Sequence, residues 1–164
     1  MLAKQSWRIA TKHESLVSKI YKGRYFKYSS FLKADTGSSP SWAWRSLLEG
    51  MKVIEKGLIW QIGNGGSVKI FEVLWIRNFR PISVYQQQNV SSDIIRVNQL
   101  LKENRTWDAE LIQSIFNSDI AASILQTTIN EEEHRITWAN EKSGHYSVAS
   151  GYQIAFFFFH SPID

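Results

Sequence analysis

The apolar residues of this chain lie in short runs whose periodicity changes several times along the sequence. The longest uninterrupted run, 154–159, has six residues, whereas a membrane-spanning helix needs about 20. The sequence therefore predicts a chain that does not cross a membrane, and its start lacks the apolar core of a secretory signal peptide. With 43% hydrophobic residues and no cysteine, the chain is too apolar for a disordered tail and has no means to form disulfides or cysteine-based metal sites. We expect an intracellular protein of one domain or slightly more.

Four segments follow from the changes of periodicity. They are a helical basic segment at 1–57, a β-hairpin with a linker at 58–82, a set of short helices at 83–130, and a second β-hairpin with a closing helix at 131–164. Together they predict an α+β, mainly helical fold of short helices with two small β-hairpins. We expect the domain to be incomplete.

The first segment contains three expected helices. Apolar spacing predicts two short helices between residues 2 and 25, with a break near 11–14. Ser41 stands where an N-cap begins a helix through Lys56, and Gly57 is its natural stop. Gly50 lies inside that helix, where it costs about 1 kcal/mol relative to alanine unless close packing needs the missing side chain.

Two pairs of β-prone runs predict the hairpins. Residues 58–62 and 67–71 alternate and flank the glycine-rich turn 63–66, and residues 135–138 and 145–148 flank a second turn. The first turn also invites a phosphate-binding interpretation. A P-loop, however, needs a lysine and a hydroxyl after its glycines, and a dinucleotide loop needs a following helix. Neither is present, so a turn is the favoured interpretation.

The second half of the chain predicts short helices. The polar run 86–89 is interpreted as a connector, and residues 93–101 as a helix. Asp108 is a candidate cap for a helix to about Phe116, and Asp119 for another to about Leu125. A closing helix begins at Ser147 or Ser150.

Charge is divided unevenly between the halves of the chain. Residues 1–82 contain 14 Lys or Arg and 5 Asp or Glu, a formal charge of +9, whereas residues 83–164 contain 5 and 10, a formal charge of −5. The densest basic stretch, 19–28, interleaves cations with aromatic rings. It is interpreted either as a solvated helix end whose tyrosines pack on neighbours, or as a nucleic-acid contact. Its candidate nucleic-acid-binding residues are Lys19, Lys22, Arg24 and Lys27.

The chain has seven tryptophans, roughly one in each short segment. Core anchoring is the simpler explanation because each ring buries a large apolar surface. A base-stacking platform is the alternative. Trp42 and Arg45, at the start of the third expected helix, are the pair that would test the base-stacking interpretation. Both join the candidate nucleic-acid-binding residues.

No constellation of residues predicts catalysis or metal binding. The four histidines are far apart, and the run Glu131–Glu133 before His134 points its side chains in different directions, so it cannot easily converge on one cation. We find no nucleophile motif and no supported carboxylate pair. The sequence therefore predicts no catalytic residue, no metal, no cofactor and no small-molecule substrate.

Several runs in order resemble one family over most of the chain. The runs are residues 1–8, 25–34, 40–48 (with Trp42-Ala43-Trp44-Arg45), 57–65, 136–138 and 144–152. The first four are similar to the polyproteins of plant non-LTR (LINE-type) retrotransposons, in the segment that follows the reverse-transcriptase polymerase. The last two are similar to the start of that family's reverse transcriptase zinc-binding domain, which precedes ribonuclease H.

The resemblance implies a connector and no enzyme. The family polymerase uses an aspartate pair, its ribonuclease H uses a carboxylate cluster, and its zinc-binding domain uses cysteines and histidines beyond its start; this chain matches none of them. We therefore expect a non-catalytic fragment, with a truncated zinc-binding-like start at 131–164, that has weak RNA or DNA binding. The alternative is a purely structural remnant without ligand or activity.

The end of the chain departs from the family. Four consecutive phenylalanines point all round a helix, so some must be exposed or pair with another chain. We expect the phenylalanine run to allow self-association with a second copy of the chain. The other expected partners are RNA or DNA, and no membrane is expected. The four consecutive phenylalanines are Phe156, Phe157, Phe158 and Phe159.

Overall fold

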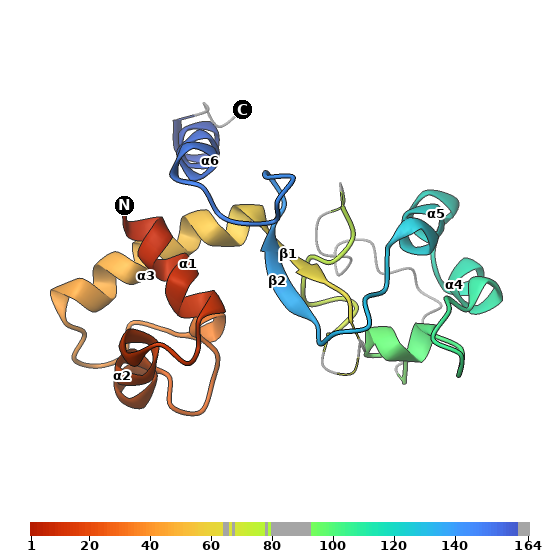
Figure 1. Ribbon diagram of the computed structural model, residues 1–164, viewed down its shortest axis with the longest axis horizontal. Coiled ribbons are helices and arrows are strands. Elements are labelled where there is room, and N and C mark those ends of the chain that lie inside the picture. The colour runs from red at the N-terminus through yellow and green to blue at the C-terminus, as the bar shows by residue number, and fades with distance from the viewer. Residues whose placement is uncertain (64–65, 67, 78, 80–92, 161–164) are drawn as a thin grey trace. The chain divides into compact units, whose positions relative to one another are not determined.

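The computed structural model describes residues 1–63, 66, 68–77, 79 and 93–160 of the chain (Figure 1). Most of the regular structure is helical and one small sheet is present, which confirms the expected α+β, mainly helical class. In chain order the elements are α1 (Leu2–Thr11), α2 (Leu16–Tyr25), the 3-10 turn η1 (Phe31–Lys33), α3 (Trp42–Gly57), β1 (Leu58–Gln61), the 3-10 turn η3 (Val97–Leu100), α4 (Ala109–Ile115), α5 (Ser118–Gln126), β2 (Arg135–Trp138) and α6 (Val148–His160).

The chain divides into two compact units. The first, called the helical unit here, comprises Met1–Leu58 with Trp138–Asp164, and the second comprises Ile59–Thr137. The chain leaves the helical unit after the first residue of β1 and returns to it at the last residue of β2.

In the helical unit, α1 crosses α3 at very short range. Ser6 is fully buried, and its hydroxyl donates to the carbonyl oxygen of Leu47 on α3 at 2.7 Å. Gly50 lies at the crossing, where an added Cβ would come within 2.8 Å of the backbone carbon of Leu2. Close packing therefore explains the glycine inside α3, because the backbone of α1 leaves no room for a side chain at Gly50.

The boundaries of α3 agree with the sequence prediction. Ser41 is its N-cap, with its hydroxyl accepting a hydrogen bond from the backbone N–H of Trp44 at 3.2 Å, and Gly57 is its last residue. The expected face is buried, because apolar side chains at helical spacing meet the other helices of the unit. Its buried apolar residues are Trp44, Leu47, Leu48, Met51 and Ile54.

The two short helices before α3 also form where expected, but their apolar residues divide differently. Trp7, Ile9 and Ala10 of α1 are buried. In α2, by contrast, Leu16 and Ile20 are 74% and 60% exposed. The apolar spacing there does not mark a core-facing side, because α2 is held instead by Tyr21 and Tyr25, which stack on Trp44.

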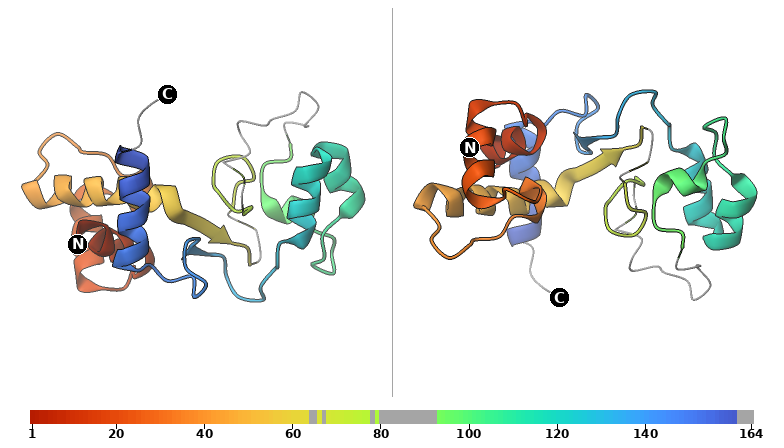
Figure 2. Two further views of the ribbon diagram at one scale, coloured as in Figure 1. Left: turned by 90° about the horizontal axis from the view of Figure 1, so that it is seen from above. Right: turned by 90° about the horizontal axis from the view of Figure 1, so that it is seen from below.

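The last helix, α6, packs against α3 and crosses it in the views of Figure 2. Ser147 caps it, accepting from the backbone N–H of Ser150 at 3.1 Å. The Ser150 hydroxyl in turn accepts from the indole N–H of Trp138 at 2.9 Å, and both of these residues are buried. Of the two expected starts of the closing helix, Ser147 is therefore the cap.

Protonation of Glu141 is expected to loosen the start of α6. Its carboxylate accepts a hydrogen bond from the Ser147 hydroxyl, and hydrogen bonds from Ser147 and then Ser150 lower the pKa of Glu141 below the ordinary value of 4.5. Because the folded pKa is depressed, this contribution is present above the unfolded pKa and is lost as pH falls through the folded pKa. Urea unfolding at a series of pH values from about 6 to about 3 should show a shallower acid loss for Glu141→Gln than for wild type. Equal acid dependence in the two proteins would contradict this prediction.

The second unit is built on a core of aliphatic side chains with Trp75 among them. β1 pairs with β2 in a two-stranded sheet, and the hydrogen bond from the Arg135 guanidinium to the Gln61 side chain at 2.8 Å follows the same pairing. The helices α4 and α5 pack on each other (Figure 1). Core residues are Ile62, Val68, Ile70, Trp75, Ile76, Val97, Leu100, Ile112, Ile115, Phe116, Ile120, Ala121 and Ile124.

The first expected hairpin is wrong in its strand partners. β1 pairs with β2, more than 70 residues later in the chain, and residues 68–70 pair instead with residues 95–97 around a bridge between Lys69 and Arg96. Alternation identifies a strand but not its partner, because pairing is decided by which apolar faces meet in the core. Within the expected turn 63–66, residues 64 and 65 lie outside the described part of the chain. An added Cβ on Gly63 would collide with the carbonyl oxygen of Glu132, so close backbone approach requires this glycine.

The second expected hairpin stops at its turn. The backbone N–H of Trp138 donates to the carbonyl oxygen of Gly144 at 2.8 Å, and Gly144 has a φ of 71°. The chain then enters α6, so the expected returning strand 145–148 does not form. The capping role of Ser147 decides this, because it commits the backbone to a helix start.

The short helices of the second unit agree in part with expectation. Only Val97–Leu100 of the expected helix 93–101 is helical, as a 3-10 turn, since Arg96 is already paired with Lys69. Asp108 caps α4 as predicted. The cap of α5 is Asn117, with Asp119 inside the first turn, so that assignment was wrong by two positions. The expected connector 86–89 lies outside the described residues.

Candidate nucleic-acid interface

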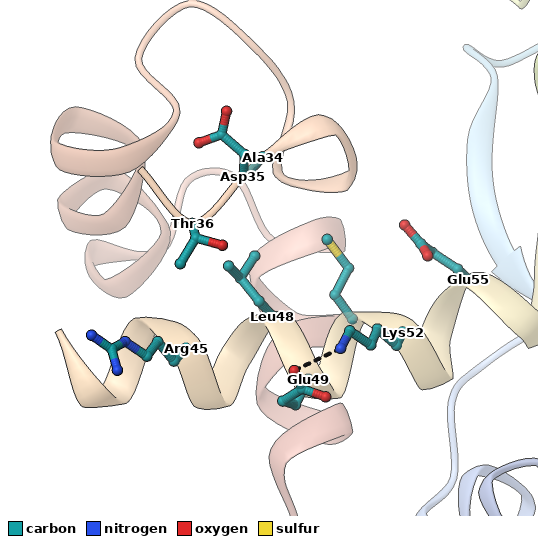
Figure 3. A pocket seen from close by; sticks show the side chains of 9 residues that line it. Ala34, Asp35, Thr36, Arg45, Leu48, Glu49, Lys52 and Glu55 are labelled. Atoms are coloured by element: carbon teal, nitrogen blue, oxygen red, sulfur yellow. Dashed lines mark hydrogen bonds and ion pairs between the residues drawn. The ribbon is translucent and has the colours of Figure 1, made fainter. Parts of the chain in front are cut away.

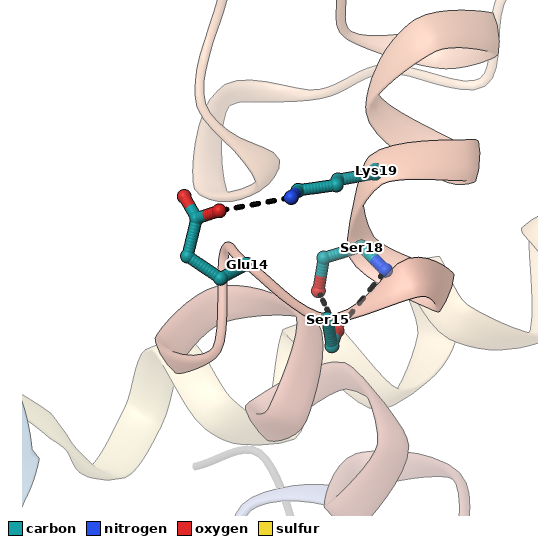
Figure 4. Close-up of polar contacts among 4 residues, drawn as sticks. All are labelled: Glu14, Ser15, Ser18 and Lys19. Atoms are coloured by element: carbon teal, nitrogen blue, oxygen red, sulfur yellow. Dashed lines mark hydrogen bonds and ion pairs between the residues drawn. The ribbon is translucent and has the colours of Figure 1, made fainter.

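Lys19, the first candidate cation of α2, is already paired with a carboxylate. Ser15 caps the helix, accepting from the backbone N–H of Ser18 at 3.2 Å, and this brings Glu14 beside the first turn (Figure 4). The Lys19 ammonium lies 2.9 Å from the Glu14 carboxylate, and both side chains are exposed. The same lysine lowers the pKa of Glu14. Lys19 is therefore the candidate with the least free charge to offer a phosphate.

The other three cations of this stretch project into solvent at the end of α2. Lys22, Arg24 and Lys27 are all exposed, and none forms an ion pair with a carboxylate in the described part of the chain. The Arg24 guanidinium lies 5.4 Å from the centre of the Tyr25 ring, and the Lys27 ammonium lies 5.3 Å from that of Tyr28. Such cations are available to neutralise phosphates.

Tyr25 fixes the end of α2 to the start of α3. Its ring stacks on that of Trp44, with centroids 4.4 Å apart and planes within 2°. Its hydroxyl donates to the Ser41 side chain at 3.0 Å and accepts from the Ser41 backbone N–H at 3.2 Å. Hydrogen bonds that the Ser41 side chain and then its backbone N–H offer to the phenolate form lower the pKa of Tyr25. Tyr25, like Tyr21, is thus a packing residue, as the simpler interpretation of the tyrosines proposed.

The start of α3 adds Trp42 and Arg45 to this group. Trp42 directly follows the Ser41 that Tyr25 contacts, and Arg45 is one helical turn further along. Trp42 is 82% exposed, and Arg45 is exposed as well. The structure therefore brings the end of α2 and the start of α3 together through the contacts of Tyr21 and Tyr25 with Ser41 and Trp44. We call Lys22, Arg24, Lys27, Trp42 and Arg45 the basic–aromatic surface.

One exposed ring was missed among the candidate residues. Tyr28, three residues after Tyr25, is 92% exposed, more than any other aromatic side chain in the described part of the chain. It stands inside the dense basic stretch, so its place between cations was visible in the sequence. What distinguishes it from Tyr21 and Tyr25 is its position beyond the last turn of α2, and this only the helix boundary reveals.

A hollow of about 450 Å³ lies between α3 and the segment 34–36 (Figure 3). Leu48 and Met51 contribute apolar lining, and Arg45 belongs both to this hollow and to the basic–aromatic surface. The remaining charged residues carry both signs, and Lys52 is already paired with Glu49 at 2.7 Å. The lining is therefore neither predominantly basic nor predominantly acidic. It consists of Ala34, Asp35, Thr36, Arg45, Leu48, Glu49, Met51, Lys52 and Glu55.

Among the described residues, no group of three or more His, Asp or Glu side chains is placed to hold a metal ion. No helix in the same part of the chain is both long and apolar enough to cross a membrane.

The phenylalanine run continues α6, and its rings are exposed as the helical arrangement requires. Phe156, Phe157 and Phe158 are 57%, 66% and 46% exposed, and the side chain of Phe159 lies outside the described part. The Lys56 ammonium of α3 lies 5.5 Å from the centre of the Phe158 ring. Self-association through this run stays a prediction.

Comparison with known proteins gives one partial likeness. Over 82 residues, half of this chain, the sequence is 38% identical to an uncharacterized mitochondrial protein of Arabidopsis thaliana. The aligned part is 53% of that protein, so the chain spans about half the length of the curated relative that it matches. No protein-family model matches the sequence. No solved structure matches it.

Proposed function

We propose that this chain is a non-catalytic fragment related to the connector of a plant retrotransposon reverse transcriptase, and that its helical unit binds RNA or DNA weakly through the basic–aromatic surface. The observation that carries the proposal is that Lys22, Arg24, Lys27 and Arg45 are all exposed and belong to the two segments that the contact between Tyr25 and Ser41 joins. The resemblance of the ordered runs to the retrotransposon family supports it.

Charge favours a polyanion as the partner. The helical unit contains 12 Lys or Arg and 6 Asp or Glu, a formal charge of +6, whereas the other unit contains 7 and 9, a formal charge of −2. Phosphate contacts supply most of non-specific nucleic-acid affinity, and each contact to a single strand adds about 0.7 to the salt-dependence slope. If four cations contact phosphates, a plot of the logarithm of affinity against the logarithm of salt concentration should have a slope of about −3.

The proposal predicts salt-sensitive binding of single-stranded RNA that depends on the end of α2. Fluorescence anisotropy of a labelled RNA, titrated with the full chain at several salt concentrations, would measure it. Changing Lys22, Arg24 and Lys27 together to alanine should weaken binding and reduce the slope from about −3 to about −1, since Arg45 remains. Unfolding by urea should change little, because all three side chains are exposed.

A control with the same change of charge separates a local site from net charge. Arg77, Lys102 and Lys142 are exposed and lie elsewhere in the chain, so their replacement by alanine should leave most of the affinity. An equal loss in both triple variants would show that only net charge matters. Absence of binding at low salt would favour the alternative, a purely structural remnant without ligand.

A further inference from the structure

We propose that the basic–aromatic surface selects single-stranded over double-stranded nucleic acid, with an unpaired base stacking on Trp42. This inference rests on the proposed function and adds the class of ligand. Seven tryptophans are distributed along the chain, and Trp42 differs from the others in exposure. Trp44, Trp75 and Trp138 are 0–2% exposed, Trp7 is 9% exposed, and Trp60 and Trp107 are half-buried. Trp42 is 82% exposed.

The backbone that carries Trp42 is held firmly. It is the first residue of α3, directly after the Ser41 cap. The Ser41 backbone N–H donates to the Tyr25 hydroxyl, and the next ring on the helix, Trp44, is fully buried. An aromatic ring on a fixed backbone loses little entropy when a ligand covers it. Trp42 is therefore placed as a platform for a flat partner.

Cations on α3 and on the adjoining end of α2 suit a nucleic-acid strand as the ligand. Arg45 is one helical turn from Trp42, and Arg24 lies beside Tyr25, whose hydroxyl meets Ser41. A base stacked on Trp42 would have its sugar–phosphate backbone within the field of these guanidinium groups. Tyr28, 92% exposed and three residues from Tyr25, offers a second ring for a neighbouring base.

Stacking on an indole distinguishes the two forms of nucleic acid. In a duplex both faces of each base are covered by neighbouring pairs, whereas a single strand can present them to an aromatic side chain. The lysines and arginines, by contrast, meet phosphates in either form. The cations thus contribute to the affinity for both single-stranded and double-stranded nucleic acid, whereas Trp42 contributes only to the affinity for single strands.

The test compares labelled single-stranded RNA with the matching duplex, titrated with the full chain at one low salt concentration. Trp42→Ala should reduce single-strand affinity about fivefold or more and leave duplex affinity within about twofold. Trp42→Phe, which keeps an aromatic face, should recover part of the loss. Tyr152→Ala is the matched control, because Tyr152 is 69% exposed in the same unit but lies on α6.

The outcomes separate this inference from the function on which it rests. Binding of both forms that depends on Lys22, Arg24 and Lys27 but is unchanged in Trp42→Ala would overturn the stacking role and leave the proposed function standing. Equal losses for single strand and duplex would also overturn it, since the indole would then act on a contact common to both. No binding of either form would remove the proposed function and this inference with it.

Discussion

Replacing Trp44 by alanine is expected to lower the free energy of unfolding by about 3–5 kcal/mol, the usual range for removing a large aromatic ring from a core. Trp44 is fully buried. Its ring stacks on Tyr25 at 4.4 Å between centroids and on Tyr21 at 5.7 Å, and its indole N–H donates to the Asp35 carbonyl oxygen at 3.1 Å. The variant would lose these contacts together and leave that carbonyl without its donor. Urea denaturation followed by far-ultraviolet circular dichroism would measure the loss.

Trp42 supplies the matched control, two residues away on the same helix. Because its side chain is 82% exposed, Trp42→Ala should change the unfolding free energy by no more than about 0.5 kcal/mol. Phe26 and Phe31 also contact Trp44, so the large effect should include loosening of the segment that follows α2. Similar stabilities for the two variants would mean that α2 is not held through Trp44.

The parts of the fold that the sequence predicts are those with local causes. Ser41 caps α3 as expected, through a backbone group only three residues away, and Gly57 ends α3 at the expected position. Capping and helix termination depend on neighbours in the chain, so a single sequence carries them. The same reasoning placed Asp108 correctly and missed Asn117, because both Asn and Asp near that start are good caps.

The parts that the sequence does not predict depend on distant partners. β1 and β2 are separated by more than 70 residues, and alternation within each strand is compatible with either a local or a remote neighbour. The orientation of α2 was hidden for a similar reason. Its apolar residues have the spacing of a helical face, but only the tyrosines among them reach Trp44, on which Tyr21 and Tyr25 stack, whereas Leu16 and Ile20 are exposed.

The candidate site shows the same division. Cations interleaved with aromatic rings were visible in the sequence, and so was Trp42 beside Arg45. The sequence did not show that Trp42 alone of the tryptophans is exposed, or that Lys19 is paired with Glu14 across the helix cap. The surroundings of Trp42 depend on the contact between α2 and α3, which joins Tyr25 and Ser41, 16 positions apart. The ion pair of Lys19 depends on the cap at Ser15, which places Glu14 beside the first turn of α2.

Adding a single methyl group at Gly50 is expected to destabilise the chain by about 2–3 kcal/mol, the upper part of the range for overpacking a core. The Cβ of Gly50→Ala would lie 2.5 Å from the Ser6 hydroxyl, 2.8 Å from the Leu2 backbone carbon and 2.9 Å from the Ala3 backbone nitrogen. Two of these atoms are backbone, so relief requires α1 to move away from α3. That movement would also weaken the hydrogen bond from Ser6 to Leu47, since both helices hold it.

Gly23 gives the opposite expectation from the same substitution. It lies inside α2, where an added Cβ meets nothing within 4 Å, and alanine is favoured over glycine in a helix interior by up to about 1 kcal/mol. Gly23→Ala should therefore raise the unfolding free energy while Gly50→Ala lowers it, although both are glycine-to-alanine changes within helices. Urea denaturation of the two variants, measured together, tests helix propensity against packing at the crossing of α1 and α3. If Gly50→Ala were as stable as wild type, α1 would have room to shift, and the tight crossing would not be what holds glycine at this position.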